Sequence, residues 1–148
     1  MKIILQRVSE ASVRVDASIV GEINKGLLVL FCAERDDTEG DVEFFMHKVA
    51  ALRIFSDENG KTNLSVRDVG GSILVVSQFT LAADWRKGNR PGFSNAAEPE
   101  LAKMLYELFC QKLREDGIPV ETGIFAADMD VSLTNDGPFT IILDSRDR

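Results

Sequence analysis

The first third of the chain is made of short stretches in which apolar and polar residues alternate. Residues 2–8, 11–15 and 19–23 follow this period of two, which is typical of β-strands with one buried face. A turn at 24–26 leads into the unbroken apolar run 27–32, which predicts a strand buried on both faces. The N-terminal segment therefore predicts a sheet built from several successive strands.

Two later segments carry apolar residues at the spacing of an α-helix. The first follows Thr38-Glu39-Gly40-Asp41, where a hydroxyl and a carboxylate three residues apart predict a capping box. The second begins near 95–98, has Pro99 in its first turn, and ends at Asp116-Gly117. The apolar positions that define these helices are Val42, Phe45, Met46, Val49 and Leu52 in the first, and Leu101, Leu105, Leu108 and Leu113 in the second.

The rest of the chain adds further strands. Residues 57–60 predict a hairpin turn, and Gly70-Gly71 precedes a second core strand at 73–76. Strands are also expected at 120–124, 130–133 and 139–143. Strand and helix do not alternate strictly, which favours a mixed, mainly antiparallel α+β sheet with two main helices over a doubly wound fold. Without a repeat or an internal linker, residues 1–148 are expected to form one domain.

The composition is that of an ordinary globular protein, with 45% apolar and 28% charged residues. No apolar run approaches the roughly 20 residues that span a bilayer, and the N-terminus lacks the apolar stretch of a signal peptide. Cys32 and Cys110 lie among apolar residues, which predicts reduced thiols in the core. These features predict a cytoplasmic protein without membrane association.

The single histidine bears on both metal binding and catalysis. His47 falls opposite the apolar stripe of its helix, so we expect it on the surface and not as a catalytic base. One histidine without paired Cys/His spacing gives no zinc pattern. We therefore expect neither a metal nor another cofactor.

The net charge of −7 argues against broad nucleic-acid binding, which depends on neutralising phosphates. One local exception is the loop 85–93, in which Arg86, Lys87 and Arg90 are interleaved with two aromatic residues. Two interpretations remain open for this basic loop. It contacts one or two phosphates, or it is a solvated surface loop.

Ser77–Leu81 lies where a core strand runs into a loop, a place where functional groups often stand. The segment offers two hydroxyls, one side-chain amide and main-chain N–H groups. Such donors can form an oxyanion hole, in which each is worth roughly 3–4 kcal/mol. Thr80 as a nucleophile needs a base, but His47 is badly placed and no other base is evident. The alternative is a strand end whose Ser and Thr satisfy main-chain groups.

Gly137-Pro138 is the other unusual feature, and it lies between two expected strands. Glycine reaches main-chain angles closed to other residues, while proline fixes φ and readily follows a cis peptide bond. Such a pair can hold two carbonyl groups rigidly in one direction. Taken alone, the pair is interpreted as an ordinary turn.

Taken together, Ser77–Leu81 and Asn135–Thr140 resemble the two-motif signature of the D-aminoacyl-tRNA deacylases. The likeness extends along the whole chain. Gln6–Val8, Arg90–Phe93 and Phe125–Met129 also resemble that family at their usual places.

The resemblance implies a barrel-like fold and a homodimer that hydrolyses the ester between a D-amino acid and the terminal adenosine of tRNA. Its active sites lie at the subunit interface, and a cis Gly137-Pro138 pair projects into the partner's pocket. The two carbonyls bind the α-ammonium group of the substrate. An L side chain is excluded sterically, whereas glycine is admitted.

The resemblance also implies a mechanism without a side-chain base. The 2′-hydroxyl of the terminal ribose helps to activate water, and the main chain around Ser77–Thr80 (Ser77, Gln78, Phe79 and Thr80) supplies the catalytic contacts and stabilises the oxyanion. Arg7 supports the Gly137-Pro138 loop. Phe125 and Met129 line the adenosine pocket, or else they are simple core residues. The basic loop, with Arg86, Lys87 and Arg90, is the expected phosphate contact.

Two other functions stay open at this point. One is a deacylase of the same fold that prefers glycyl or another misloaded acyl group. The other is a noncatalytic dimeric module that binds acylated or free RNA ends.

Overall fold

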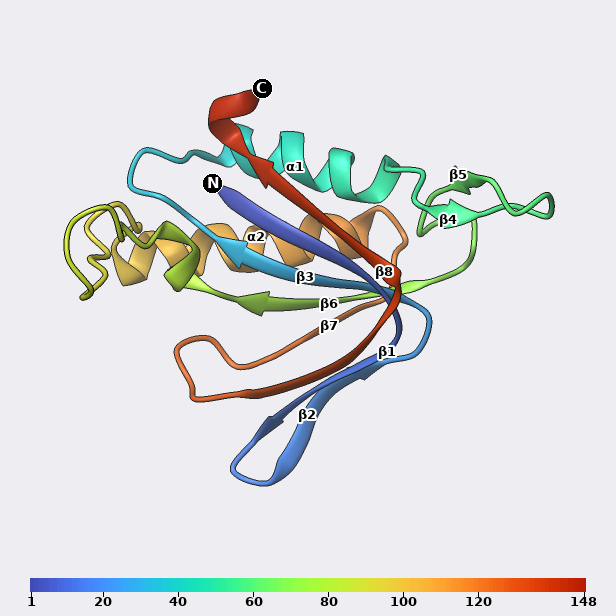
Figure 1. The fold of residues 1–148 in the computed structure, drawn as a ribbon, viewed down its shortest axis with the longest axis horizontal. Helices are drawn as coiled ribbons and strands as arrows, with labels where there is room; N and C mark the ends of the chain where they lie inside the picture. Colours follow the sequence, from blue (N-terminus) through green and yellow to red (C-terminus); the bar gives the residue numbers. More distant parts are fainter.

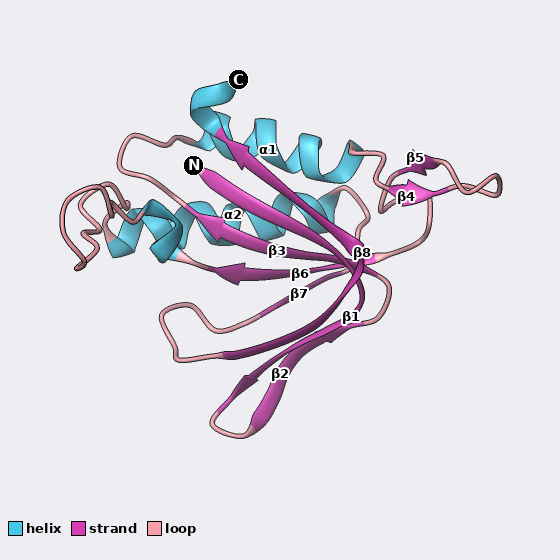
Figure 2. Cartoon of the chain, in the orientation of Figure 1, coloured by secondary structure: helices cyan, strands magenta, loops and turns pink.

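A strongly curved sheet with two helices on one face forms the body of the protein, and the computed structural model describes residues 1–148 (Figures 1 and 2). The strands are β1 (Lys2–Val15), β2 (Ser18–Ile23), β3 (Gly26–Cys32), β4 (Phe55–Ser56), β5 (Thr62–Leu64), β6 (Ser72–Ser77), β7 (Val120–Thr122) and β8 (Asp130–Asp144). The helices are α1 (Glu39–Ala51) and α2 (Pro99–Glu115), with short 3-10 segments η1 (Phe79–Ala82) and η2 (Ser145–Asp147).

Strand β1 organises the sheet because it pairs with three other strands. Its first half is antiparallel to β3, its second half is antiparallel to β2, and β8 runs antiparallel along nearly its whole length. The remaining pairs, β3 with β6 and β6 with β7, are parallel. The predicted mixed, mainly antiparallel α+β fold with two main helices is therefore confirmed.

Two pairs of predicted strands are single strands in the structure. The expected strands 2–8 and 11–15 form one bent strand, because the chain stays paired with β8 on both sides of Ser9. The expected strands 130–133 and 139–143 are likewise both parts of β8, whose pairing shifts register around Val8. Strand β7 ends at Thr122, two residues earlier than expected.

The curvature brings the two ends of the sheet close together. Figure 2 shows β2 and the second half of β1 bending away from the helices. Gly21 of β2 lies against the carbonyl of Thr122 in β7, where a Cβ atom would collide with that main chain. Glycine therefore permits the close approach that makes the sheet a nearly closed, barrel-like structure.

The central strands are buried on both faces because successive residues enter two separate cores. Leu27, Val29 and Phe31 of β3 pack under α1 and α2, in the larger core cluster. Leu28 packs in a second cluster inside the curved half of the sheet, together with Leu74 of β6. This arrangement explains why the run 27–32 shows no alternation.

The helices begin as expected. The Asp41 carboxylate accepts hydrogen bonds from the amide and the hydroxyl of Thr38, each at 2.8 Å, at the start of α1. Pro99 is the first residue of α2.

Cys32 and Cys110 are buried free thiols, and His47 is exposed, as expected. No helix is long and apolar enough to span a membrane.

Candidate functional site

A cavity of about 500 Å³ opens between the ends of β3 and β6, the start of α2 and the loop from β7 to β8. Ser77, Gln78 and Phe79 line it from the β6 side, and Phe125 and Met129 line it from the loop. Its other walls are formed largely by small side chains, those of Ala33, Ala96, Ala97, Ala102, Ala126 and Ala127. The structure therefore brings together two of the segments singled out in the sequence.

The Ser77–Thr80 segment is fixed by main-chain contacts. Ser77 is the last residue of β6 and pairs with Phe31, and the Gln78 amide donates a 2.7 Å hydrogen bond to the Phe31 carbonyl. The chain then turns into η1, where the amides of Phe79 and Thr80 have no preceding helical acceptor. The Gln78 amide is thus occupied, and the donors available here are those of Phe79 and Thr80.

Thr80 lies outside the cavity lining. Its side chain is exposed, and its hydroxyl accepts a 2.5 Å hydrogen bond from the side-chain amide of Gln78. No histidine or carboxylate is bonded to this hydroxyl. His47 lies on the exposed side of α1, away from the cavity lining.

Phe125 and Met129 line the cavity and also pack against the two core clusters. The Phe125 ring centroid lies 5.8 Å from that of Tyr106, and the side chain packs against the larger core cluster. Met129 packs against the second cluster and against Gly123. Between them, Ala126 has a φ of +65°, a left-handed conformation that is uncommon for residues other than glycine.

Two ionisable residues of the lining, Cys32 and Asp128, were not predicted from the sequence to be site residues. Burial, and to a lesser extent the nearby Glu34 charge, raises the pKa of the Cys32 thiol to about 11, so this thiol is protonated at neutral pH. Asp128 supplies the one carboxylate of the lining and is exposed. Its only sequence signal is its position between Phe125 and Met129.

Gly137-Pro138 lies elsewhere, on an exposed stretch of β8. The peptide bond between the two residues is cis, and Gly137 has a φ of +139°. Arg7 braces this stretch through hydrogen bonds from Nε to the Asp136 carbonyl at 2.9 Å and from Nη1 to the Ile54 carbonyl at 2.7 Å. Its guanidinium also lies over the Phe139 ring, 4.8 Å from the centroid.

Within one chain the Gly137-Pro138 pair and the cavity are far apart. Arg7 is opposite Leu27 at the start of β3, whereas Ser77 is opposite Phe31 near its end, about 13 Å further along the strand. Strands β1 and β3 also separate β8 from β6, which adds about 14 Å across the sheet. Arg7, Gly137 and Pro138 are all absent from the cavity lining.

The basic loop meets the cavity lining through Phe93, one of its two aromatic residues. Asp84 and Gly92 form a two-way main-chain bridge at the base of the loop. The ring of Phe93, the next residue, meets the Phe79 ring edge-on with centroids 5.1 Å apart. The three cations of the loop, Arg86, Lys87 and Arg90, are all exposed.

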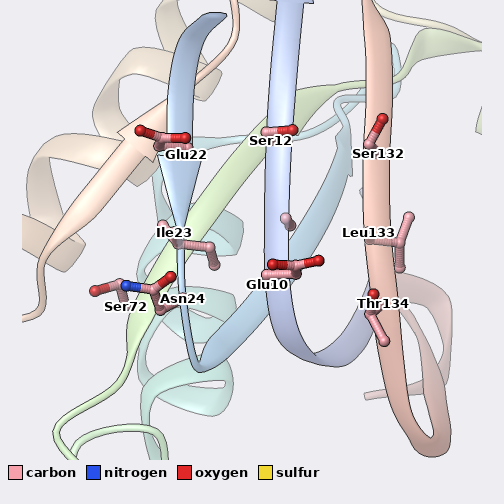
Figure 3. Close-up of a pocket in the computed structure, with 10 residues that line it drawn as sticks. Glu10, Ser12, Glu22, Ile23, Asn24, Ser72, Ser132, Leu133 and Thr134 are labelled. Carbon is pink, nitrogen blue, oxygen red and sulfur yellow. The ribbon is translucent and has the colours of Figure 1, made fainter.

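A second cavity, of about 650 Å³, lies on the surface formed by β1, β2 and β8 (Figure 3). Its lining is polar and includes the carboxylates of Glu10 and Glu22, which disfavour an anionic partner. None of the residues singled out in the sequence lies there. The candidate site is therefore the cavity at the end of β6.

Comparison with known proteins decides the family. The family model described as D-Tyr-tRNA(Tyr) deacylase matches residues 4–144. The chain belongs to this deacylase family. It is 60% identical over 146 residues to the D-aminoacyl-tRNA deacylase of Anaeromyxobacter dehalogenans, covering 99% of this chain and 98% of the relative. It is also 59% identical to the enzyme of the same name from Clostridioides difficile, covering 98% and 97%.

Solved structures agree with the deacylase fold. One, described as c-Myc DNA Unwinding Element Binding Protein, superposes with a TM-score of 0.93 at 41% identity, covering 98% of this chain and 99% of that one. Another, described as a probable eukaryotic D-amino acid tRNA deacylase, has a TM-score of 0.80 at 19% identity and supports the fold alone, covering 96% and 97%.

The D-aminoacyl-tRNA deacylase family consists of ester hydrolases, so the activity of this chain is D-aminoacyl-tRNA deacylation. The noncatalytic RNA-binding module is thereby set aside.

Proposed function

We propose that D-aminoacyl-tRNA is hydrolysed in the cavity at the end of β6, and that Gly137-Pro138 of a second copy completes this site. The separation of the two motifs within one chain carries the proposal. Each motif is exposed and rigidly held, yet neither reaches the other in its own subunit. In a twofold dimer each copy supplies one loop and receives one, so two equivalent sites form.

The outer face of β1 and β8 supports such a dimer. Ile142 is 73% exposed on β8, and its register partner on β1 is the half-buried Ile4. These two isoleucines form an apolar patch on β1 and the edge strand β8, and a second copy of the chain would cover it. The patch lies on the same strand as Gly137-Pro138, so one contact would cover the isoleucines and deliver the loop.

In this site the carbonyl groups of Gly137 and Pro138 accept hydrogen bonds from the substrate's α-ammonium group. The brace from Arg7 holds the loop in place. Because rigid main chain closes this side of the pocket, an L side chain has no room, whereas a D side chain points away. Chirality is then selected without a contact to the side chain itself.

The ester is attacked by water, and the terminal ribose 2′-hydroxyl helps to activate that water. Oxyanion charge that develops on the carbonyl oxygen is stabilised by the amides of Phe79 and Thr80, each worth roughly 3–4 kcal/mol when well placed. Ser77 and Gln78 position this segment on β3. The C–O bond then breaks, and the 3′-oxygen of the ribose leaves with a proton, which gives a free D-amino acid and tRNA.

The terminal adenosine lies against Phe125 and Met129, the largest apolar side chains of the β7–β8 loop in the cavity. The phosphates that follow it contact Arg86, Lys87 and Arg90. This contact is local, so it is compatible with the overall charge of −7.

Glycyl-tRNA is the second substrate that this site favours. Glycine lacks a side chain, so a gate that works by steric exclusion alone admits it. The small alanine side chains around the cavity provide no group that selects for a particular side chain.

A side-by-side assay of D-tyrosyl-, glycyl-, L-tyrosyl- and L-alanyl-tRNA at catalytic enzyme concentration tests the proposal. We expect hydrolysis of the first two and resistance of both L substrates. Hydrolysis of L-alanyl-tRNA at a comparable rate would contradict steric selection. A glycyl rate well above the D-tyrosyl rate would identify the enzyme as chiefly a glycyl deacylase.

A further inference from the structure

Trp85 is the only tryptophan of the chain and is 75% exposed, at the start of the basic loop. A large aromatic side chain with so much free surface contributes little to the core. The same loop carries the cations Arg86, Lys87 and Arg90, all of them exposed. The combination of a free aromatic face and clustered cations is typical of surfaces that bind single-stranded nucleic acid.

The backbone on both sides of Trp85 is held in place. The Asp84 amide donates to the Gly92 carbonyl at 2.8 Å, and the Gly92 amide donates to the Asp84 carbonyl at 2.9 Å. The Asp84 carboxylate also accepts a 3.1 Å hydrogen bond from the Arg86 amide. The indole is therefore presented from a fixed base, which lowers the entropy cost when a ligand binds to it.

Exposed aromatic rings lead from the cavity to this loop. Phe79, which lines the cavity, is 55% exposed, and it meets the 36% exposed Phe93 edge-on. Because Asp84 is opposite Gly92, Phe93 lies beside Ala83, and Trp85 lies two residues further from the cavity, about 7 Å along the ribbon. A strand leaving the cavity along Phe79 and Phe93 would therefore pass Trp85.

We propose that Trp85 stacks on an unpaired base of the tRNA acceptor end, next to the terminal adenosine, while the three cations contact the adjoining phosphates. The proposal rests on the proposed function, in which the cavity holds the terminal adenosine. Stacking requires a free base face, which single-stranded nucleotides offer and paired ones do not. Positive charge in this loop of an otherwise acidic protein complements the phosphates.

This contact is remote from the ester, so it affects binding of tRNA and not the chemical step. Trp85→Ala is expected to raise KM for D-tyrosyl-tRNA about 5- to 150-fold, the range typical of removing one base–aromatic stack, with little change in kcat. Trp85→Phe should restore most of the affinity. Hydrolysis of D-tyrosyl-adenosine, which lacks the other nucleotides, should be unchanged in both variants. Phe44→Ala removes an exposed aromatic residue from α1 and is the matched control.

The single tryptophan also provides a direct binding signal. Uncharged tRNA should quench Trp85 fluorescence, and tRNA trimmed of its unpaired 3′ nucleotides should not. Equal quenching by both RNAs, no quenching by either, or an equal loss with D-tyrosyl-adenosine in Trp85→Ala would overturn the stacking proposal and leave deacylation intact. If the native enzyme hydrolysed neither substrate, the proposed function would fail instead, and the fluorescence would still decide the question of stacking.

Discussion

The Nε atom of Arg7 donates a 2.9 Å hydrogen bond to the main-chain carbonyl of Asp136, the residue immediately before Gly137. The same guanidinium reaches the Ile54 carbonyl and the Phe139 ring, and only 12% of the Arg7 side chain is exposed. One side chain on β1 therefore fixes the loop that is proposed to enter the partner subunit. This relationship links the stability of the fold to its activity.

Replacing Arg7 should lower both the stability of the fold and the activity of the enzyme. Arg7→Ala removes two charge-assisted hydrogen bonds, so we expect a loss of about 2–4 kcal/mol in the free energy of unfolding and a large drop in kcat/KM. Arg7→Lys should rescue little, because an ammonium group cannot reproduce the planar fork. Denaturant unfolding and D-tyrosyl-tRNA hydrolysis measure the two effects.

Arg14→Ala is the matched control for Arg7, since Arg14 lies on the same strand and donates a single bond, to the Ala17 carbonyl. A change in this control as large as that in Arg7→Ala would mean that the effect is not specific to the loop.

Gly137→Ala should inactivate the enzyme. At a φ of +139° a Cβ atom would lie 3.0 Å from Arg7 Nη2 and 3.1 Å from the Phe139 amide nitrogen, so the loop or its brace must move. We expect a stability loss of about 1–3 kcal/mol and loss of most hydrolysis. Gly60→Ala is the control, because Gly60 also has a positive φ but no atom within 4 Å of its Cβ position. Retained activity in Gly137→Ala would argue against a role for this main chain.

Catalysis without a side-chain base predicts an unequal response to three changes. Replacing the terminal ribose 2′-hydroxyl by hydrogen should lower turnover by about 10²- to 10⁴-fold, the scale of a general acid–base contribution. Thr80→Ala and Asp128→Asn should each cost less than about 10-fold. Single-turnover assays with matched tRNAs measure all three. A larger loss in Thr80→Ala would restore Thr80 as a nucleophile, and one in Asp128→Asn would make the cavity carboxylate the base.

Charge reversal in the basic loop should weaken tRNA binding and reduce its salt dependence. Removing one cation–phosphate pair lowers the slope of log K against log salt concentration by about 1, so Lys87→Glu with Arg90→Glu should lower it by about 2. Lys103→Glu, on the exposed face of α2, should leave the slope unchanged. An unaltered slope in the double variant would remove this loop from the tRNA interface.

Local patterns predicted most of the elements, because the information for them is local. The run Leu27–Cys32 is recognisable as a doubly buried strand, and Pro99 as a helix start, from neighbouring residues alone. The continuity of β1 and β8 depends instead on pairing between residues more than 100 positions apart, such as Lys2 with Asp144. Nothing near Ser9 in the sequence encodes that pairing.

The candidate site likewise combines features that the local sequence reveals with spatial relationships that it does not. Ser77–Thr80 and Gly137-Pro138 stand out by residue type, but their separation in one chain follows from the strand order and is invisible in the sequence. The hydrogen bond that occupies the Gln78 amide depends on Phe31, a residue of another strand. Asp128 lies within the Phe125–Met129 segment, but its residue type alone gives no sign that its side chain lines the cavity, and only the fold places it there.

Each active site is proposed to combine the cavity of one copy with the Gly137-Pro138 loop of another. Two inactive variants test it when coexpressed, one with the cavity filled by Ala102→Phe and one with the loop altered by Gly137→Ala. Half of the random dimers are mixed, and each mixed dimer contains one site with an intact cavity and an intact loop. We therefore expect coexpression to recover about a quarter of native activity. No recovery from a mixture shown to contain mixed dimers would contradict it.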